Sequence, residues 1–171
     1  MIQDSYPSIF KNEYQNRPYQ EGDSILVFNE AGEVLVRNAM EHFGQESLLK
    51  KSDLPQMALT DHLEYLFAID ERSYYLLWKM DLLIPDGFSY RSIRELRDHC
   101  SGTEVFAIFT AYHLWKWYSD NQFCGKCGAG LTFDRRERAL RCPKCGQVIY
   151  PRINPAVIFG VIKGDSILIT R

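Results

Sequence analysis

Four cysteines occur in two closely spaced pairs, a pattern that binds metal ions. Each pair has two residues between its cysteines, and fourteen residues separate the pairs, which consist of Cys124, Cys127, Cys142 and Cys145. A two-residue gap lets both thiolates of a pair reach one ion from a tight turn, and the intervening stretch is long enough for a hairpin. The spacing predicts a tetrahedral Cys₄ site for Zn²⁺. Two disulfides or four unrelated buried cysteines are the alternatives, and the doubly matched spacing argues against both.

The role of this metal follows from its ligands. A Cys₄ site is coordinatively closed, so its zinc has no open position for water and is expected to be structural. The second pair, Cys-Pro-Lys-Cys-Gly, also resembles rubredoxin, in which iron carries electrons. Rubredoxins have a longer stretch between their pairs than this charged, hairpin-like one, so zinc is favoured over iron.

Charged side chains are the next candidates for chemistry. Glu137 lies among arginines between the cysteine pairs, where it either contacts a ligand or pairs with a neighbouring arginine. Arg91, Arg94 and Arg97 follow one edge of an expected helix, and ordinary i,i+4 pairs with acidic neighbours are the alternative there. None of the four histidines has metal-binding spacing with another, and the sequence has no P-loop, Gly-x-Ser-x-Gly or Gly-x-Gly-x-x-Gly motif.

The net charge of −2 is unevenly distributed along the chain. Residues 1–123 contain 11 Lys and Arg against 19 Asp and Glu, a balance of −8, whereas residues 124–171 contain 9 against 3, a balance of +6. A basic metal-binding module suggests an anionic partner, such as phosphate or nucleic acid. The alternative is that so small a module simply exposes its basic side chains.

Composition predicts a soluble protein. With 171 residues, 46% of them apolar, the chain can form one full domain and smaller pieces. Its first residues lack the basic and apolar regions of a signal peptide, and the longest apolar stretch, about 156–162, is far shorter than the ~20 residues of a membrane span. Unpaired Cys100 fits a reducing compartment. We therefore expect a cytoplasmic protein with no membrane association.

The first half of the chain contains two pairs of strand-like segments. Residues 24–28 and 33–37 are joined by Asn-Glu-Ala-Gly, which predicts a hairpin loop, and residues 65–69 and 74–78 flank a charged break. Aromatic and β-branched residues dominate these segments. They predict a small antiparallel sheet.

Helical patterns follow Pro85-Asp86-Gly87. Ile93, Leu96 and Cys100 recur at helical spacing after the cap candidate Ser89, and the capping-box pattern at 101–104 opens a longer helix over about 104–120. Apolar residues cover most of this helix, which predicts a core or interface element in preference to a cofactor site: Val105, Phe106, Ile108, Phe109, Tyr112, Leu114, Trp115 and Trp117.

The metal-binding module continues directly from this helix, so it should be rigidly mounted on the first domain. After the second cysteine pair, Pro151 and Pro155 mark an extended connector. Residues 156–162 and 166–170 then form an expected hairpin around Lys163-Gly164-Asp165. Two strands alone are marginally stable, and a domain rarely ends inside a strand.

The order of these features resembles a known family. An aromatic helix leads into Phe123-Cys124-Gly125-Lys126-Cys127-Gly128, a basic hairpin, the second cysteine pair and then Tyr150-Pro151-Arg152-Ile153-Asn154-Pro155. This pattern strongly resembles the zinc-ribbon NADH pyrophosphatases (NAD⁺ diphosphatases) of the Nudix hydrolase superfamily. The resemblance is tight over about residues 120–171 and looser before them, where it rests on the order of elements and on Ser92-Ile93-Arg94.

The resemblance implies a function. Family members hydrolyse the pyrophosphate of NADH or NAD⁺ to nicotinamide mononucleotide and AMP, and some act on NAD-capped RNA. Their Nudix helix holds Mg²⁺ or Mn²⁺, their ribbon holds structural zinc, and they form homodimers. By position, Cys124, Cys127, Cys142 and Cys145 match the zinc ligands. Glu137, Tyr150 and Arg94 match substrate contacts, and Arg37 matches another more weakly because its alignment needs a gap.

One departure from the family is clear: the Nudix box, Gly-x₅-Glu-x₇-Arg-Glu-U-x-Glu-Glu-x-Gly-U, is absent. Arg94-Glu95-Leu96 is a coincidental match, because Asp98 and His99 stand where the box requires paired glutamates and Met80 where it requires its first glycine. The chain is therefore expected to be the N-terminal part of such an enzyme and to be inactive alone, with no catalytic residue of its own.

These expectations define an α+β fold in three parts. They are an N-terminal α+β domain over 1–120, a Cys₄ zinc ribbon over 121–150, and the first hairpin of an incomplete Nudix α/β/α domain over 151–171. The alternative function is a non-catalytic ribbon module that binds nucleic acid or protein. An in-frame Nudix box directly downstream of Arg171 would decide between the two.

Overall fold

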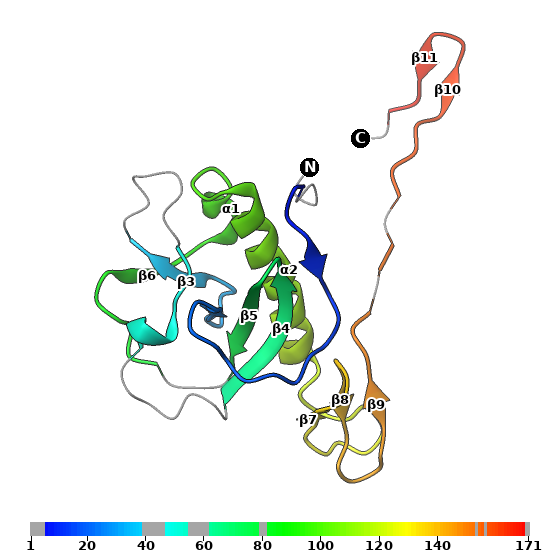
Figure 1. The fold of residues 1–171 in the computed structure, drawn as a ribbon. Coiled ribbons are helices and arrows are strands. Elements are labelled where there is room, and N and C mark those ends of the chain that lie inside the picture. The colour runs from blue at the N-terminus through cyan, green and yellow to red at the C-terminus, as the bar shows by residue number, and fades with distance from the viewer. Residues whose placement is uncertain are drawn as a thin grey trace.

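A mixed sheet, one long helix and a small metal-binding unit make up most of the computed structural model (Figure 1). The structure describes residues 6–38, 47–54, 62–78, 82–152, 154–155 and 157–169. The combination of sheets and few helices confirms the α+β class. In the described part of the chain, no helix has the length and apolarity needed to cross a membrane. Met80 and His42 lie outside the described residues.

The central sheet has the strand order β1-β4-β5-β2. β4 and β5 form the predicted antiparallel hairpin, and Asp70 at its turn has a φ of 53°. β2 instead runs parallel to β5, so the prediction of a purely antiparallel sheet is wrong for this pair. The bounds are Phe10–Lys11 for β1, Ser24–Leu26 for β2, Leu63–Ile69 for β4 and Arg72–Leu77 for β5.

A second, two-stranded sheet pairs β3 (Val34–Arg37) with β6 (Phe88–Arg91). The predicted turn between β2 and β3 forms, since the backbone N–H of Asn29 donates to the carbonyl of Glu33 at 3.0 Å. The two strands then diverge into separate sheets, which the hairpin pattern did not indicate. β6 was missed because it starts directly after the Pro-Asp-Gly turn. The cap prediction for Ser89 is wrong, since this residue lies within β6.

Two α-helices and one 3₁₀ turn, η1 (Lys51–Asp53), occur among the described residues. α1 (Ile93–Leu96) is a single turn that begins after Ser92, shorter than the pattern to Cys100 predicted. α2 (Gly102–Asp120) begins after Ser101, whose side chain accepts a hydrogen bond from the N–H of Glu104. The Glu104 carboxylate does not complete a capping box, because it accepts hydrogen bonds from Ser47.

The apolar residues of α2 form core, as predicted. Its most deeply buried members lie against the central sheet, and its outer aromatic residues pack on Phe28 from the β2–β3 turn: Tyr112 and Trp115. Gly32 in that turn has a φ of 79°, and a side chain there would meet the Tyr112 ring at 3.0 Å. Close approach of this turn to α2 therefore depends on glycine.

The metal-binding unit follows α2 as a three-stranded sheet of short strands, β7 (Thr132–Phe133), β8 (Leu140–Arg141) and β9 (Val148–Ile149). The connector then leads to β10 (Ile162–Lys163) and β11 (Ser166–Ile167), a hairpin that extends away from the rest (Figure 1). These strands are shorter than predicted, and positions 156 and 170 lie outside the described residues. The proposed domain boundaries stay a prediction.

The metal-binding unit packs directly on the N-terminal domain, as the missing linker predicted. Phe133 in β7 contacts the rings of Trp78 and Tyr118, with centroids 5.8 and 4.8 Å away. Next to this aromatic contact, Glu64 of β4 pairs with Arg135, their Oε2 and Nη1 atoms 3.2 Å apart. The Glu64 side chain is only 4% exposed. Burial raises the pKa of this carboxyl to about 7, although Arg135, Tyr14 and Arg138 favour its ionised form.

The raised pKa makes Glu64 a source of pH-dependent stability. Because the folded protein binds this proton more tightly than the unfolded chain, stability from this group is highest below about pH 4.5 and falls as the pH rises toward 7. We expect Glu64→Gln to remove that dependence. The free energy of unfolding of the variant, relative to that of the parent, should therefore rise by about 2 kcal/mol from pH 5 to pH 8. Urea unfolding of both proteins in excess zinc measures this difference. Identical pH profiles would contradict it.

Candidate metal centre and substrate groove

The two cysteine pairs form two equivalent turns. In the first, the N–H of Gly128 donates to the carbonyl of Cys124 at 2.9 Å, and in the second the N–H of Gly146 donates to Cys142 at 3.0 Å. Gly128 and Gly146 have φ values of 72° and 74°, a left-handed conformation that favours glycine. The glycine after each pair thus closes the turn that aims both sulfurs in one direction.

The four sulfur atoms meet at one point, where they lie within 4.8 Å of one another. Across the turns, Cys124 Sγ is 3.6 Å from Cys145 Sγ, and Cys127 Sγ is 3.5 Å from Cys142 Sγ. Tetrahedral zinc with Zn–S bonds of about 2.3 Å separates its sulfurs by about 3.8 Å. A disulfide needs about 2.05 Å, so this arrangement fits one ion and not two disulfides. The four cysteines predicted as ligands are therefore brought together.

The electrostatics of the turns favour the thiolate at Cys142 and Cys124, whereas the pKa of Cys127 is raised by the neighbouring Cys142 thiol despite the backbone N–H donor of Ala129. Backbone N–H groups, that of Cys145 first among them, lower the pKa of the Cys142 thiol to about 6. Backbone N–H donors also lower the pKa of Cys124. Thiolate is the form that binds zinc. With four sulfur ligands the ion has no open position, so the zinc is structural.

Glu137 and Tyr150 lie together beside this centre. The Tyr150 hydroxyl donates to Glu137 Oε1 at 2.9 Å, and this bond raises the pKa of the phenol. Arg141, one of the neighbouring arginines, is more distant, with Nη2 3.9 Å from the same oxygen. Tyr150 remains 53% exposed, so a ligand can reach part of its ring. The structure thus joins two of the predicted substrate contacts, whose roles stay predictions.

The other two predicted contacts lie elsewhere in the chain. Arg94 is exposed in α1, just before the start of α2, whereas the ribbon follows the other end of α2 (Figure 1). The 19 residues of α2 make a helix about 28 Å long, which separates the two. Arg37 lies in β3, where its Nη2 is 2.9 Å from Asp53 Oδ1 and its guanidinium stacks over the Phe88 ring. Among the contacts of the described residues, neither arginine meets Glu137 or Tyr150. Their assignment to the substrate stays a prediction.

A groove of about 540 Å³ runs past Tyr150 along β9. It combines exposed rings with cationic side chains, because Phe123 is 71% exposed and the lining includes Lys126 and Arg152. Such a groove can hold a flat base and an anionic phosphate. Sequence reasoning did not assign these three residues to the site. Phe123 and Arg152 belong to the motifs that flank the cysteine pairs, and this position was the sequence feature that could have indicated their place in the site.

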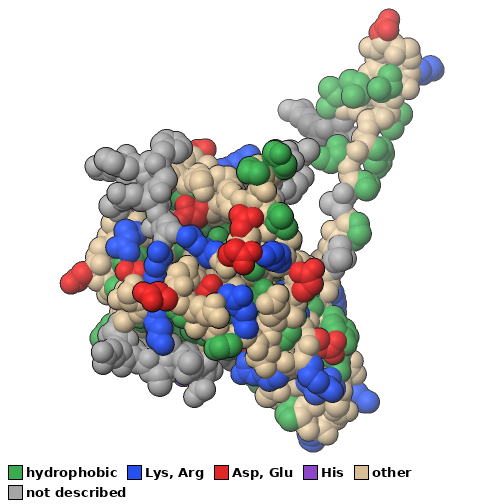
Figure 2. Space-filling view, viewed as in Figure 1, with side chains coloured by type: hydrophobic (Ala, Val, Ile, Leu, Met, Phe, Trp, Pro, Cys, Tyr) green, Lys and Arg blue, Asp and Glu red, His purple; other side chains and the backbone are tan. Residues whose placement is uncertain are grey.

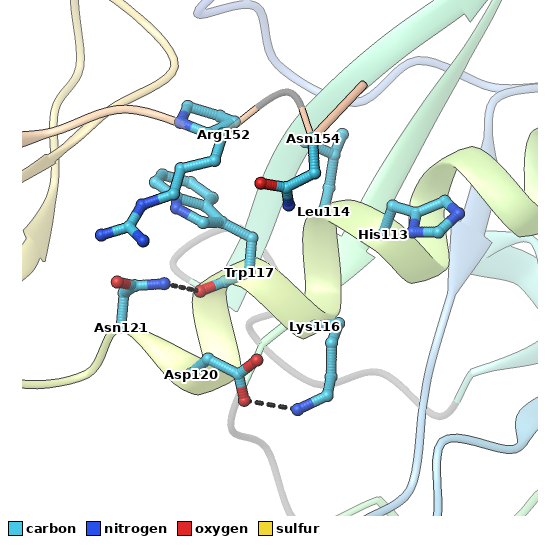
Figure 3. Close-up of a pocket in the computed structure, with 9 residues that line it drawn as sticks. His113, Leu114, Lys116, Trp117, Asp120, Asn121, Arg152 and Asn154 are labelled. Atoms are coloured by element: carbon cyan, nitrogen blue, oxygen red, sulfur yellow. Dashed lines mark hydrogen bonds and ion pairs between the residues drawn. The ribbon is translucent and has the colours of Figure 1, made fainter. Parts of the chain in front are cut away.

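A second hollow of about 630 Å³ adjoins the groove at Asn121 and Arg152 (Figure 3). It lies between the last turns of α2 and the connector, which contributes Arg152 and Asn154. Asn121 donates to the carbonyl of Trp117, and Lys116 pairs with Asp120 across its floor. Lysine and arginine side chains also gather over the ribbon surface (Figure 2). The connector is thus flanked by two hollows that share one arginine.

Comparison with known proteins identifies the metal-binding unit. Residues 119–150 match the family model of the NADH pyrophosphatase zinc ribbon domain. The chain is also similar, over part of its length, to proteins named NAD-capped RNA hydrolase NudC. The protein from Pseudomonas aeruginosa (strain LESB58) is 32% identical over 125 residues, which are 72% of this chain and 43% of that protein. The protein from Stutzerimonas stutzeri (strain A1501) is 41% identical over 85 residues, which are 50% and 31%.

The fold and site define a Cys₄ zinc ribbon mounted on an α+β domain. The chain is related to the NADH pyrophosphatase family and corresponds to the N-terminal portion of its members, as the sequence resemblance predicted. The matched region spans less than half the length of these curated relatives.

Proposed function

We propose that this chain is the substrate-recognising N-terminal part of an enzyme that hydrolyses the pyrophosphate of NADH, NAD⁺ or NAD-capped RNA. The products would be nicotinamide mononucleotide and AMP, or the corresponding RNA end. The observation that carries the proposal is the Tyr150–Glu137 pair beside the zinc centre, in which the exposed Tyr150 lines a groove with cationic side chains. The names of the similar proteins support the same substrate class.

Each element of the site has a distinct task in this proposal. Zinc fixes the ribbon, and the hydrogen bond to Glu137 orients the Tyr150 ring for stacking on a base. The Glu137 carboxylate accepts hydrogen bonds from the ligand, while Lys126 and Arg152 attract its phosphates. Arg94 and Arg37 would contribute from a second copy or after rearrangement, which agrees with a proposed homodimer.

The chemical step needs a further part of the enzyme. Mg²⁺ or Mn²⁺, held by the glutamates of a Nudix box, would polarise the pyrophosphate and activate water. This sequence contains no such box. We also propose that the protein acts in the cytoplasm.

The direct test is binding of NADH by the zinc-loaded chain, measured through NADH fluorescence. We expect saturable binding that weakens when Tyr150 is replaced by alanine. The alternative is a ribbon that binds nucleic acid without catalysis. It requires the chain to bind an uncapped RNA with the same affinity as the same RNA carrying an NAD cap. A ribbon of that kind would expose aromatic rings for base stacking, but Phe133, an aromatic residue between the cysteine pairs, packs on Trp78 and Tyr118, which disfavours that alternative.

The proposal also predicts what the chain does not do. We expect the purified chain to release no AMP from NADH in the presence of Mg²⁺, because the glutamates that would hold this ion are missing. Chromatographic detection of AMP measures the result, with the full-length Pseudomonas aeruginosa relative as the positive control. Mg²⁺-dependent release by material free of host enzymes would contradict the expectation.

A further inference from the structure

The loop between β7 and β8, residues 134–139, is here called the arm loop, and two arginines attach it to the N-terminal domain. Arg135 Nη1 lies 3.2 Å from Glu64 Oε2 on β4. Arg138 Nη1 donates to Asn12 Oδ1 at 2.9 Å, and its Nη2 donates to the carbonyl of Leu66. The loop therefore binds both β4 and the N-terminal segment.

Burial makes these attachments specific. The Tyr14 hydroxyl donates to the second oxygen of Glu64 at 3.1 Å, so both carboxylate oxygens have partners. Both charges lie in a poorly solvated contact. This desolvation lowers the pKa of Arg138 and raises that of Glu64. A buried charge that loses its partner is costly, so this contact tolerates few alternative arrangements. We call Tyr14, Glu64, Arg135 and Arg138, with Asn12 and the Leu66 carbonyl, the arm clamp.

The arm loop is also braced internally. Buried Asp134 accepts from the backbone N–H of Arg136 at 2.9 Å and from Arg141 Nε at 2.7 Å. The N–H of Ala139 donates to the carbonyl of Glu137 at 2.8 Å. A loop with these internal bonds moves largely as one piece. Fixing Arg135 and Arg138 therefore fixes Glu137 between them.

We infer that Glu64 and Arg138, on opposite sides of the arm clamp, are positioning residues for the dinucleotide site. They act through the arm loop, which presents Glu137 to the Tyr150 hydroxyl. The inference rests on the function proposed above. Sites held by such supporting contacts lose affinity when the support is loosened, even though no contact with the ligand is removed.

The first test measures the loop itself, without a ligand. In the zinc-loaded chain with Arg138→Ala, we expect the amides of Arg136 and Ala139 to exchange with deuterium at least tenfold faster, because the loop has lost its main attachment. Amides of the cysteine turns and of β4–β5 should be unchanged. Arg136→Ala is the matched control, since it removes the same charge from the same loop at a side chain that is 79% exposed and whose ion pair, with Asp134 at 3.6 Å, lies within the loop and not between the loop and the N-terminal domain. Equal protection in Arg138→Ala and the parent would overturn the inference.

The second test measures NADH affinity in the same proteins. We expect Arg138→Ala to weaken binding about tenfold and Arg136→Ala by less than twofold, with Arg138→Lys recovering part of the loss. If the parent binds NADH and the loosened variant binds equally well, the positioning role is wrong and the proposed function stands. If the parent binds no NADH, the proposed function is wrong. The positioning role is then wrong as well, even if hydrogen exchange shows that the arm clamp holds the arm loop.

One further variant covers a failure to fold. Arg138→Met keeps much of the buried side-chain stem while removing the guanidinium. If Arg138→Ala is unfolded, the exchange and binding measurements are made on Arg138→Met, with the same expected direction and the same overturning results.

Discussion

Replacing Cys142 with serine is expected to abolish zinc binding and to unfold the ribbon. Cys142 is buried, and its sulfur is 3.5 Å from that of Cys127, so the remaining three ligands cannot close the tetrahedron. Binding by structural zinc sites is worth on the order of 10 kcal/mol or more, which exceeds the stability of so small a unit. Metal analysis should give about one zinc per parent chain and almost none in the variant.

Cys100→Ser is the control for this experiment, because Cys100 is buried in the N-terminal domain, outside the metal cluster. It should retain zinc. Zinc retained by Cys142→Ser, or iron with a red colour in the parent protein, would show that the metal assignment is wrong.

The second large effect is expected at the Tyr150–Glu137 pair. In an enzyme that joins this chain to a Nudix domain, we expect Tyr150→Ala and Glu137→Ala each to lower kcat/KM for NADH about tenfold or more. Stacking on an aromatic ring is worth roughly 1–3 kcal/mol, and 1.4 kcal/mol corresponds to one decade. Zinc content and folding should be unchanged, because neither side chain is a metal ligand.

Two controls make this result interpretable. Tyr150→Phe keeps the ring and loses only the bond to Glu137, so it should lose less than Tyr150→Ala. Tyr6→Ala removes another exposed tyrosine, far from the ribbon in sequence, and should have no effect. If both Tyr150→Ala and Glu137→Ala kept the wild-type kcat/KM, the ribbon would have only a structural role and the predicted substrate contacts would be wrong.

The parts of the site that could be predicted from sequence are those formed by local spacing. The cysteine turns, with Gly128 and Gly146, are each closed within a few residues, so their pattern is visible in the chain. Tyr150 and Glu137 were found through the resemblance. Their mutual hydrogen bond was not predicted, because it depends on how the arm loop folds back.

Contacts between distant segments could not be predicted in this way. Arg135 and Glu64 are 71 residues apart, and neither belongs to a motif that indicates the other. The same limit explains the parallel pairing of β2 with β5, since a three-residue strand is too short to specify its neighbour. The wrong assignment of Ser89 as a helix cap has the same cause, because only the pairing of β6 with β3 places this residue in a strand.

The outlying hairpin of β10 and β11 has a consequence for how the chain behaves at high concentration. Ile158, Phe159 and Ile169 are at least 80% exposed, and apolar side chains gather on the hairpin below its charged tip (Figure 2). Exposed strand edges that carry apolar residues are templates for pairing with other chains. Within the described molecule, this hairpin is therefore the segment most disposed to self-association, and concentration-dependent aggregation of the chain would begin there rather than at the charged ribbon.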